Sequence, residues 1–263
     1  MAFENLLFDV KDGLARLTFN RPSAANSFNR DMVLEFLEAA TICCDDPEIR
    51  AVLLTGSGRF FSAGGDLKSF AAATGDDVSA SVGKIADSLH AAISKFVRMN
   101  APVVAAVNGA AAGAGMSVVC MADIALAAES AIFSMAYTAA GLAPDGSSTY
   151  FLPRIVGLRR ARELMLTNRR LSASEAHAWG IVERVVPDAD LMAEAEKLAR
   201  ALANGPTLAF GEVKRLLLSS QTAQLEDQLD AESRAIASMT TTSDGREGVT
   251  AFREKRLPNF KGA

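Results

Sequence analysis

The stretch 102-PVVAAVNGAAAGAGMSVVCMADIALAA-128 is the most apolar part of this 263-residue chain and decides its fold. One asparagine, three glycines and one aspartate interrupt it, which argues against a membrane span. Its pattern predicts a buried strand at residues 103–107, a glycine-rich turn, a helix of small residues from about Gly113, and a strand at 124–127. Strand, helix and strand in succession are typical of a parallel sheet covered by helices.

The same alternation continues on the N-terminal side of this stretch. There the residue spacing predicts a hairpin of strands at 6–10 and 14–19 around an Asp-Gly turn, a helix at 31–41, a strand at 51–55 and a helix at 78–97. From residue 148 onward the pattern is nearly all helical. We therefore predict an α/β core over residues 1–200 and a helical C-terminal region over residues 201–263.

Composition narrows the class of protein. The chain is 49% hydrophobic, and its formal net charge is −4 with a pI of about 5.4, so no basic surface invites nucleic acid. The three cysteines, Cys43, Cys44 and Cys120, form no disulfide framework, and no Cys/His spacing indicates a metal site. The first residues do not resemble a signal peptide. We expect a cytoplasmic enzyme that does not bind membranes.

Two glycine-rich segments follow predicted strands: 60-FFSAGGDLK-68 and 108-NGAAAGAGM-116. Small residues let the backbone approach a ligand closely, and a helix that begins in such a turn presents free N–H groups to an anion. Amides from two loops that converge on one oxygen would form an oxyanion hole. Taken singly, the first segment also fits a tight loop with Asp66 as a helix N-cap, and the second fits close helix–sheet packing.

Several motifs, in order along nearly the whole chain, resemble those of the crotonase (enoyl-CoA hydratase/isomerase) superfamily. They are Asn20-Arg21-Pro22, residues 61–68, residues 106–109 with the Gly113-Ala114-Gly115 turn, residues 171–180 and residues 246–256. The resemblance implies a ββα-superhelix spiral core with a helical C-terminal extension. It also implies an acyl-CoA thioester as substrate, with coenzyme A as part of that substrate and no other cofactor. The expected assembly is a homotrimer or a dimer of trimers.

The resemblance further implies roles for individual residues. The amides of Gly65 and Ala114 would hold the thioester oxygen. Coenzyme A would contact the first segment and, from a neighbouring subunit, the C-terminal region; the residues concerned are Ala63, Asp66, Leu67, Lys68, Phe252 and Lys255. The sequence departs from the family at Ser23, where a lysine often follows Arg-Pro, and this removes one expected contact with coenzyme A.

The acid/base residues decide the reaction. Enoyl-CoA hydratases resemble one another in carrying two glutamates that handle the water, and this chain has Ser117 and Tyr137 at those positions. A serine or tyrosine hydroxyl has too high a pKa to replace a carboxylate as base near neutral pH. The sequence therefore argues against hydration by the two-glutamate route.

The carboxylate that does appear is Asp145, in a Pro-Asp-Gly turn. Considered alone, it fits a turn residue or a helix N-cap. The chain nevertheless resembles 1,2-epoxyphenylacetyl-CoA isomerases and Δ3,Δ2-enoyl-CoA isomerases, in which one acidic residue serves as acid/base. On that resemblance Asp145 would be the catalytic residue of an acyl-CoA isomerase, because one group can remove a proton and return it elsewhere.

Other functions stay open at this stage. The chain also resembles 4-chlorobenzoyl-CoA dehalogenases, in which Asp145 would be the nucleophile and His90 the base, although Tyr137 and Gly65 replace aromatic residues expected there. A hydratase and a non-catalytic acyl-CoA binder are further alternatives. Tyr137 either lines the pocket and orients Asp145 or packs in the core. Residues 68–90 are expected to shape the acyl pocket.

Overall fold

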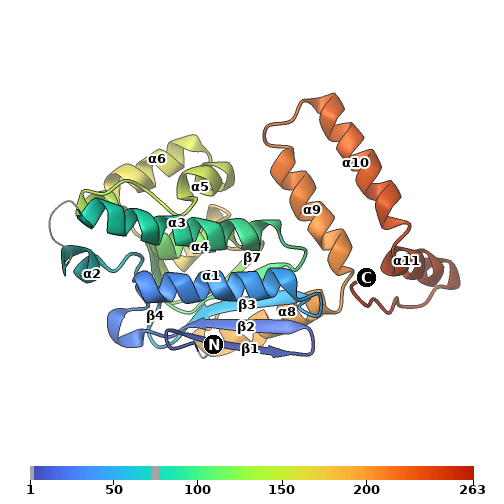
Figure 1. Cartoon of the computed structure of the whole chain (residues 1–263), viewed down its shortest axis with the longest axis horizontal. Helices are drawn as coiled ribbons and strands as arrows, with labels where there is room; N and C mark the ends of the chain where they lie inside the picture. Colours follow the sequence, from blue (N-terminus) through green and yellow to red (C-terminus); the bar gives the residue numbers. More distant parts are fainter. Residues whose placement is uncertain (1–2, 73–76) are drawn as a thin grey trace.

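The computed structural model describes residues 3–72 and 77–263 as two sheets with helices packed around them (Figure 1). The larger sheet has the strand order β1-β2-β3-β5-β7-β10. Its strands are β1 (Leu6–Lys11), β2 (Leu14–Phe19), β3 (Ala51–Gly56), β5 (Val103–Val107), β7 (Ile124–Ala128) and β10 (Arg184–Val186). The β1–β2 pair is antiparallel and the others are parallel, which confirms the predicted hairpin and parallel sheet.

The hairpin turn has the backbone that its sequence predicts. Asp12 has φ of 53° and Gly13 has φ of 75°, so both central residues are left-handed. A two-residue turn of this kind matches the twist of the strands on either side, and aspartate followed by glycine is a preferred pair for it.

A second, smaller sheet was not predicted. It contains β4 (Phe60–Ser62), β6 (Ala110–Ala112), β8 (Ile132–Ser134) and β9 (Leu171–Ser172), in that order. Strands of two or three residues are too short to show a period of two in the sequence. The β4–β6 pair is parallel and lays the two glycine-rich segments side by side, so this sheet organises the site described below.

Helices cover both faces of the larger sheet. On one face lie α1 (Arg30–Asp45) and α3 (Asp77–Arg98), and on the other lies α8 (Leu191–Ala203). The strand residues alternate accordingly: Val103 and Ala105 belong to the main core, whereas Val104 packs with the cluster that contains α8. The predicted helix of small residues is α4 (Ala114–Met121), in which every residue is buried.

The short helix α2 (Leu67–Ala72) begins within the first glycine-rich segment. The remaining helices lie in the second half of the chain. They are α5 (Ser148–Val156), α6 (Leu158–Thr167), α7 (Ala173–Ala178), α9 (Thr207–Ser219), α10 (Leu225–Met239) and α11 (Ser243–Glu254). Short 3-10 helices lie at Pro22–Ala24, Thr138–Ala140 and Asp188–Asp190. The mainly helical pattern after residue 148 is thus present, but β9 and β10 interrupt it.

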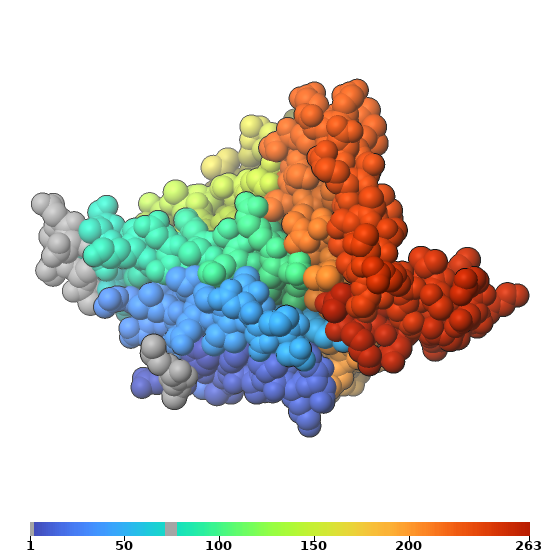
Figure 2. All heavy atoms as spheres, turned by 45° about the vertical axis from the view of Figure 1, so that its right-hand side comes forward, coloured from blue at the N-terminus to red at the C-terminus, as the bar shows by residue number. Residues whose placement is uncertain are grey.

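The last three helices project away from the sheets (Figures 1 and 2). A buried lysine holds α9 to the core: the Nζ of Lys214 lies 2.7 Å from a carboxylate oxygen of Asp123 and donates to the carbonyl oxygen of Phe96 at 2.9 Å. Burial lowers the pKa of Lys214, and the Asp123 carboxylate opposes that shift. No helix in the described part of the chain combines the length and apolarity needed to cross a bilayer.

Candidate active site

The first glycine-rich segment contains an amide, that of Gly65, that has no partner among the described residues. Phe28 N–H donates to the Gly64 carbonyl oxygen at 2.7 Å, and Asp66 N–H donates to the Phe28 carbonyl oxygen at 3.0 Å. Gly64 itself has φ of +89°, a conformation that glycine adopts at little cost. Among the described residues nothing accepts a hydrogen bond from the Gly65 amide, so this donor is free.

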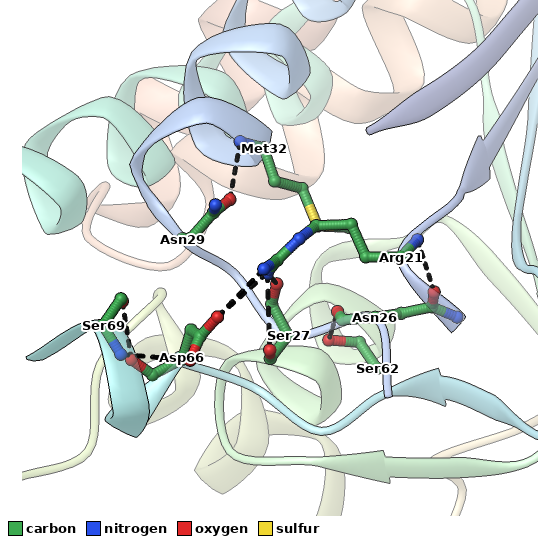
Figure 3. A network of polar contacts seen from close by, with 8 residues as sticks. All are labelled: Arg21, Asn26, Ser27, Asn29, Met32, Ser62, Asp66 and Ser69. Atoms are coloured by element: carbon green, nitrogen blue, oxygen red, sulfur yellow. Dashed lines mark hydrogen bonds and ion pairs between the residues drawn. The ribbon is translucent and has the colours of Figure 1, made fainter. Parts of the chain in front are cut away.

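Asn26 supports this loop from a fully buried position (Figure 3). Its side-chain amide donates to the carbonyl oxygens of Ser57 at 2.9 Å and Phe60 at 2.7 Å, and its side-chain oxygen accepts from the Arg21 N–H. The Ser62 hydroxyl donates to the Asn26 carbonyl oxygen at 2.8 Å. Asn26 has φ of 53°, which asparagine tolerates better than most residues. The 20–29 segment therefore fixes the path of β4 into the loop.

Asp66 forms an ion pair with Arg21 beside that loop (Figure 3). Two guanidinium nitrogens lie 3.1 Å from one carboxylate oxygen, and the other oxygen accepts from the Ser69 N–H at 3.2 Å, which is the expected N-cap contact. Burial opposes the charged form, but the Ser69 amide and the Arg21 guanidinium together hold the pKa of Asp66 below its ordinary value. The carboxylate of Asp66 thus stabilises the loop.

The second free amide belongs to Ala114, the first residue of α4. Gly113 precedes it with φ of +50° and donates its own N–H to the Ser134 carbonyl oxygen at 3.0 Å. Within the described residues the Ala114 amide, like that of Gly65, has no acceptor. Both donors therefore follow a glycine with positive φ.

The two loops touch through their backbones. A methyl group built on Gly64 would lie 2.7 Å from the carbonyl oxygen of Ala112 and 2.9 Å from the nitrogen of Ala114. Only glycine permits this approach, which brings the two free amides to one cavity.

That cavity has a volume of about 400 Å³ and is mostly apolar. Gly65 and Ala114 lie on one side of it. Its other lining residues include Phe28, Phe70, Val82, Gly83, Ile85, Leu89, Leu142 and Pro144. Among the described residues that line it, Asp145 is the only carboxylate. The cavity thus combines two free amides, one carboxylate and an apolar wall, as an enolate-stabilising site requires.

Asp145 contacts His90 across 55 positions of sequence. His90 comes from α3, and its Nε2 lies 2.5 Å from Oδ1 of Asp145. The side chains are 48% and 35% exposed, respectively, so both groups are accessible to solvent or to a ligand. His90 and Asp145, which the resemblance to dehalogenases had placed in one site, therefore form a contacting pair.

Ser117 and Tyr137, which replace the two glutamates of hydratases, both contact the main chain of Asp145. The Tyr137 hydroxyl donates to its carbonyl oxygen at 3.0 Å, the Ser117 hydroxyl lies 2.9 Å from the same oxygen, and the two hydroxyls are 3.0 Å apart. Burial raises the pKa of Tyr137 far above its ordinary value, so its hydroxyl stays protonated. The sequence had left the role of Tyr137 open; it both lines the cavity and contacts Asp145.

The predicted coenzyme A contacts fall in two places. Ala63 and Leu67 line the cavity, and Lys68 is exposed beside them on α2. Phe252, which is 86% exposed, and Lys255 lie at the end of α11, on the opposite side of the molecule from α2 (Figure 1). One chain does not bring these two groups together, so a shared site stays a prediction that requires a second subunit.

The sequence analysis missed two features of the site. Asn26 was not recognised as a buried support, although a polar residue between a predicted strand and a predicted helix was a signal for this. Gly83, inside α3, lines the cavity; it falls in the 68–90 segment expected to shape the acyl pocket but was not singled out there. A glycine inside an amphipathic helix was the available signal, because it weakens a helix without an evident reason.

The two-sheet fold is that of the crotonase superfamily, as comparisons with known proteins show. A model of the enoyl-CoA hydratase/isomerase family matches residues 9–263. The chain is 40% identical over 262 residues to 1,2-epoxyphenylacetyl-CoA isomerase of Escherichia coli K12, with 98% of this chain and 99% of the relative covered. It is 36% identical over 246 residues to 4-chlorobenzoyl coenzyme A dehalogenase-2 of Arthrobacter, with 94% and 89% covered.

A solved structure agrees with these relationships. The enoyl-CoA hydratase of Bacillus anthracis superposes with a TM-score of 0.92 at 32% identity, covering 99% of this chain and 100% of that one. The chain therefore belongs to the enoyl-CoA hydratase/isomerase family, and the predicted superfamily and fold are confirmed.

Proposed function

We propose that this enzyme is an acyl-CoA isomerase that uses Asp145 as its single acid/base group. One observation carries the proposal: among the described residues, the cavity with the two free amides is lined by one carboxylate only. Isomerisation needs one such group, since the proton that leaves one carbon can return to another. The 40% identity to 1,2-epoxyphenylacetyl-CoA isomerase supports the same reaction class.

The chemistry follows from the positions of these groups. Asp145 takes a proton from the carbon α to the thioester carbonyl, and the negative charge moves to the thioester oxygen. The Gly65 and Ala114 amides donate to that oxygen, and each donor of this kind contributes about 3 kcal/mol to lowering the barrier. Asp145 then returns the proton to a different carbon, which shifts the double bond.

Ser117 and Tyr137 support isomerisation over hydration. Water addition by two carboxylates requires a second ionised group near the thioester, and these positions carry neutral hydroxyls directed at the carbonyl oxygen of Asp145. With the pKa of Tyr137 raised by burial, it cannot act as a base near neutral pH.

The His90–Asp145 contact favours a second candidate, a hydrolase that resembles 4-chlorobenzoyl-CoA dehalogenase. Here Asp145 would attack the ring carbon that bears the halogen, halide would leave, and His90 would activate water to hydrolyse the aryl ester. The 2.5 Å separation of His90 Nε2 and Asp145 Oδ1 satisfies the proximity that this route needs. The 36% identity to an Arthrobacter dehalogenase agrees with it.

A panel of thioesters distinguishes the candidates. The purified enzyme would be incubated with cis-3-enoyl-CoA, 1,2-epoxyphenylacetyl-CoA, 4-chlorobenzoyl-CoA and trans-2-enoyl-CoA, and the products separated by chromatography and mass spectrometry. We expect isomers from the first two and at least about a hundredfold less hydration of the last. Halide release with a transient aryl ester on Asp145 would establish the dehalogenase instead. Tight binding without any turnover would establish a non-catalytic binder.

Two variants test the role of Asp145. Asp145→Asn should lower kcat by about 10²- to 10⁴-fold while the substrate affinity changes little, because the acid/base group is lost and the amides remain. Asp87→Asn is the matched control, because Asp87 is exposed on α3 and does not line the cavity among the described residues. Isomerase activity retained in Asp145→Asn would refute the assignment.

We further propose that the helices of the C-terminal region pack against another copy of the chain in a trimer or a dimer of trimers. These helices expose large apolar side chains that a solitary chain leaves in water: Val213, Leu217, Leu225, Leu229, Ile236, Val249 and Phe252. In such an assembly Phe252 and Lys255 would cover coenzyme A bound to a neighbour. Light scattering measures the mass, and Ile236→Glu should shift it towards a single chain.

A further inference from the structure

His90 lies between two cavities. The Asp145 carboxylate and the free amides belong to the cavity of about 400 Å³, whereas His90 lines a separate cavity of about 740 Å³ between α3, α5 and α9. Polar side chains share this second cavity with it: Ser94, Arg98, Ser147, Tyr150, Arg215 and Ser219. The isomerisation proposed above makes no use of this second space.

The two nitrogens of the imidazole have different surroundings. Nε2 contacts Oδ1 of Asp145 at 2.5 Å, while Nδ1 has no hydrogen-bond partner in the described part of the chain. The side chain is 48% exposed. One edge of the ring thus contacts the carboxylate, and about half of the side chain is exposed to solvent.

The imidazole of His90 gives Asp145 a second path for protons to solvent, and this path matters when a substrate is bound. The cavity around Asp145 is mostly apolar, and an acyl group that fills it excludes water from the substrate side of the carboxylate. The contact with His90 does not depend on that space. A proton held by Asp145 in the complex can therefore leave through the imidazole without dissociation of the substrate.

We propose that His90 exchanges protons between Asp145 and the solvent of the second cavity while the substrate is bound. The step rests on the enolate chemistry of the proposed function. A substrate C–H bond breaks, its electron pair stays in the enolate, and an O–H bond forms on Asp145. That proton passes from Oδ1 to Nε2, which leaves a carboxylate and an imidazolium. The imidazolium exchanges its protons with water and returns one to Asp145, which delivers it to carbon. The net change is replacement of a substrate proton by a solvent proton.

His90 acts through Asp145 and is therefore a positioning residue with a relay function. A histidine that merely oriented the carboxylate would alter the rate of isomerisation, but it would leave unchanged the fraction of abstracted protons that exchange with solvent. The origin of the proton that returns to carbon is thus the property that separates the two roles.

The experiment measures exchange without isomerisation. Phenylacetyl-CoA has α-protons and no double bond to shift, so the enzyme can exchange these protons in D₂O only by forming the enolate and reprotonating it. Deuterium at the α-carbon would be followed by NMR for the unmodified enzyme and for His90→Gln. Glutamine keeps an N–H that can donate to Asp145 but has no basic nitrogen.

We expect exchange in His90→Gln to fall by about tenfold or more, which is the scale of a lost proton-transfer group, whereas double-bond isomerisation in H₂O falls much less. His177→Gln is the matched control, because this second histidine lies on α7, contacts the Val182 carbonyl oxygen and should leave exchange unchanged. His90→Ala should show the same loss, and circular dichroism checks that each variant is folded.

The outcomes separate this proposal from the proposed function. Exchange at the unmodified rate in both His90 variants overturns the relay and leaves the isomerase standing. His90-dependent exchange without isomerisation of any thioester supports the relay and rejects the isomerase. An unmodified enzyme that exchanges no α-proton overturns the relay.

Discussion

The Tyr137 hydroxyl lies 3.0 Å from the main-chain carbonyl oxygen of Asp145, and through this contact it holds the backbone of the acidic residue without touching its carboxylate. Ser117 reaches the same oxygen from α4 at 2.9 Å. Two hydroxyls on one carbonyl oxygen fix the backbone of the residue whose side chain faces the cavity. Positional accuracy of a reacting group affects kcat more than substrate binding.

Removal of the Tyr137 hydroxyl should therefore affect turnover first. We expect Tyr137→Phe to lower kcat by about tenfold with KM nearly unchanged, because the carboxylate is less accurately placed. The lost buried hydrogen bond should lower the free energy of unfolding by about 1 kcal/mol. Steady-state kinetics and urea denaturation measure the two effects. Tyr150→Phe, on α5 outside the first cavity, serves as control, and an equal kcat for Tyr137→Phe would contradict the positioning role.

The close approach of the two glycine-rich loops can be tested at Gly64. A methyl group there would meet Ala112 O at 2.7 Å and Ala114 N at 2.9 Å, at a backbone φ of +89°. We expect Gly64→Ala to displace the Ala114 amide and lower kcat by about 10²- to 10³-fold, as for the loss of one oxyanion donor. The strain of alanine at this positive φ should also lower the free energy of unfolding by about 2 kcal/mol.

Gly83→Ala is the matched control for that change. A methyl group at Gly83 meets no atom within 4 Å, and the residue lies inside α3. Alanine should therefore raise the free energy of unfolding by about 0.5–1 kcal/mol and leave kcat nearly unchanged. If Gly64→Ala were as well tolerated as Gly83→Ala, the two loops would not be in contact as described.

A larger side chain at Gly83 should alter the choice of acyl group. A cavity of about 150 Å³ accommodates a benzene ring in other proteins, so the 400 Å³ space leaves room for an aryl-bearing acyl chain. We expect Gly83→Leu to reduce kcat/KM for arylacyl thioesters by about tenfold or more, while four-carbon thioesters change about twofold. Competition between the two substrates measures the ratio. Equal losses for both would show that Gly83 does not shape the acyl site.

The Arg21–Asp66 pair predicts a pH dependence of stability. The pKa of Asp66 is lowered in the folded chain, so its contribution is complete above the ordinary value of about 4 and is lost as the pH falls through the lowered value. We expect Asp66→Asn to lower the free energy of unfolding by about 2 kcal/mol at pH 7, from the lost charged hydrogen bonds. Denaturation of the unmodified protein and of Asp66→Asn between pH 7 and pH 2 should show that the difference in their free energies of unfolding shrinks in the acid range. A difference that grew on acidification would contradict the lowered pKa.

Much of the fold could be predicted because the relevant signals are local. The Asp12-Gly13 turn, the apolar run at residues 103–107 and the helix of small residues after Gly113 each follow from a few neighbouring residues, and each is present. The second sheet could not be predicted in this way. Its strands have two or three residues each and exist because distant segments pair, as Phe60 does with Ala110.

The predictions about the site divide in the same way, between local motifs and contacts between distant segments. The resemblance of their motifs to those of the crotonase superfamily made Gly65, Ala114 and Asp145 candidates, and these residues line one cavity. Only the resemblance to dehalogenases placed His90 with Asp145, since their contact depends on how α3 crosses the loop before α5. The sequence could not connect Ser117 with Tyr137, because two hydroxyls 20 positions apart carry no signal until the backbone between them is folded. The described residues end at 72 and resume at 77, so part of the 68–90 segment expected to shape the acyl pocket lies outside them.

The shared acceptor of Ser117 and Tyr137 also constrains how this chain could evolve. Ser117 is fully buried, and a methyl group on Gly146 would already lie 3.0 Å from its Cβ. A glutamate introduced there alone would set a buried negative charge against the carbonyl oxygens of Gly113 and Asp145, which lie beside the present hydroxyl. Glutamate at position 117 alone should therefore lower the stability of the fold without supplying a functional second carboxylate. Hydration by two carboxylates therefore requires further substitutions besides the one at position 117.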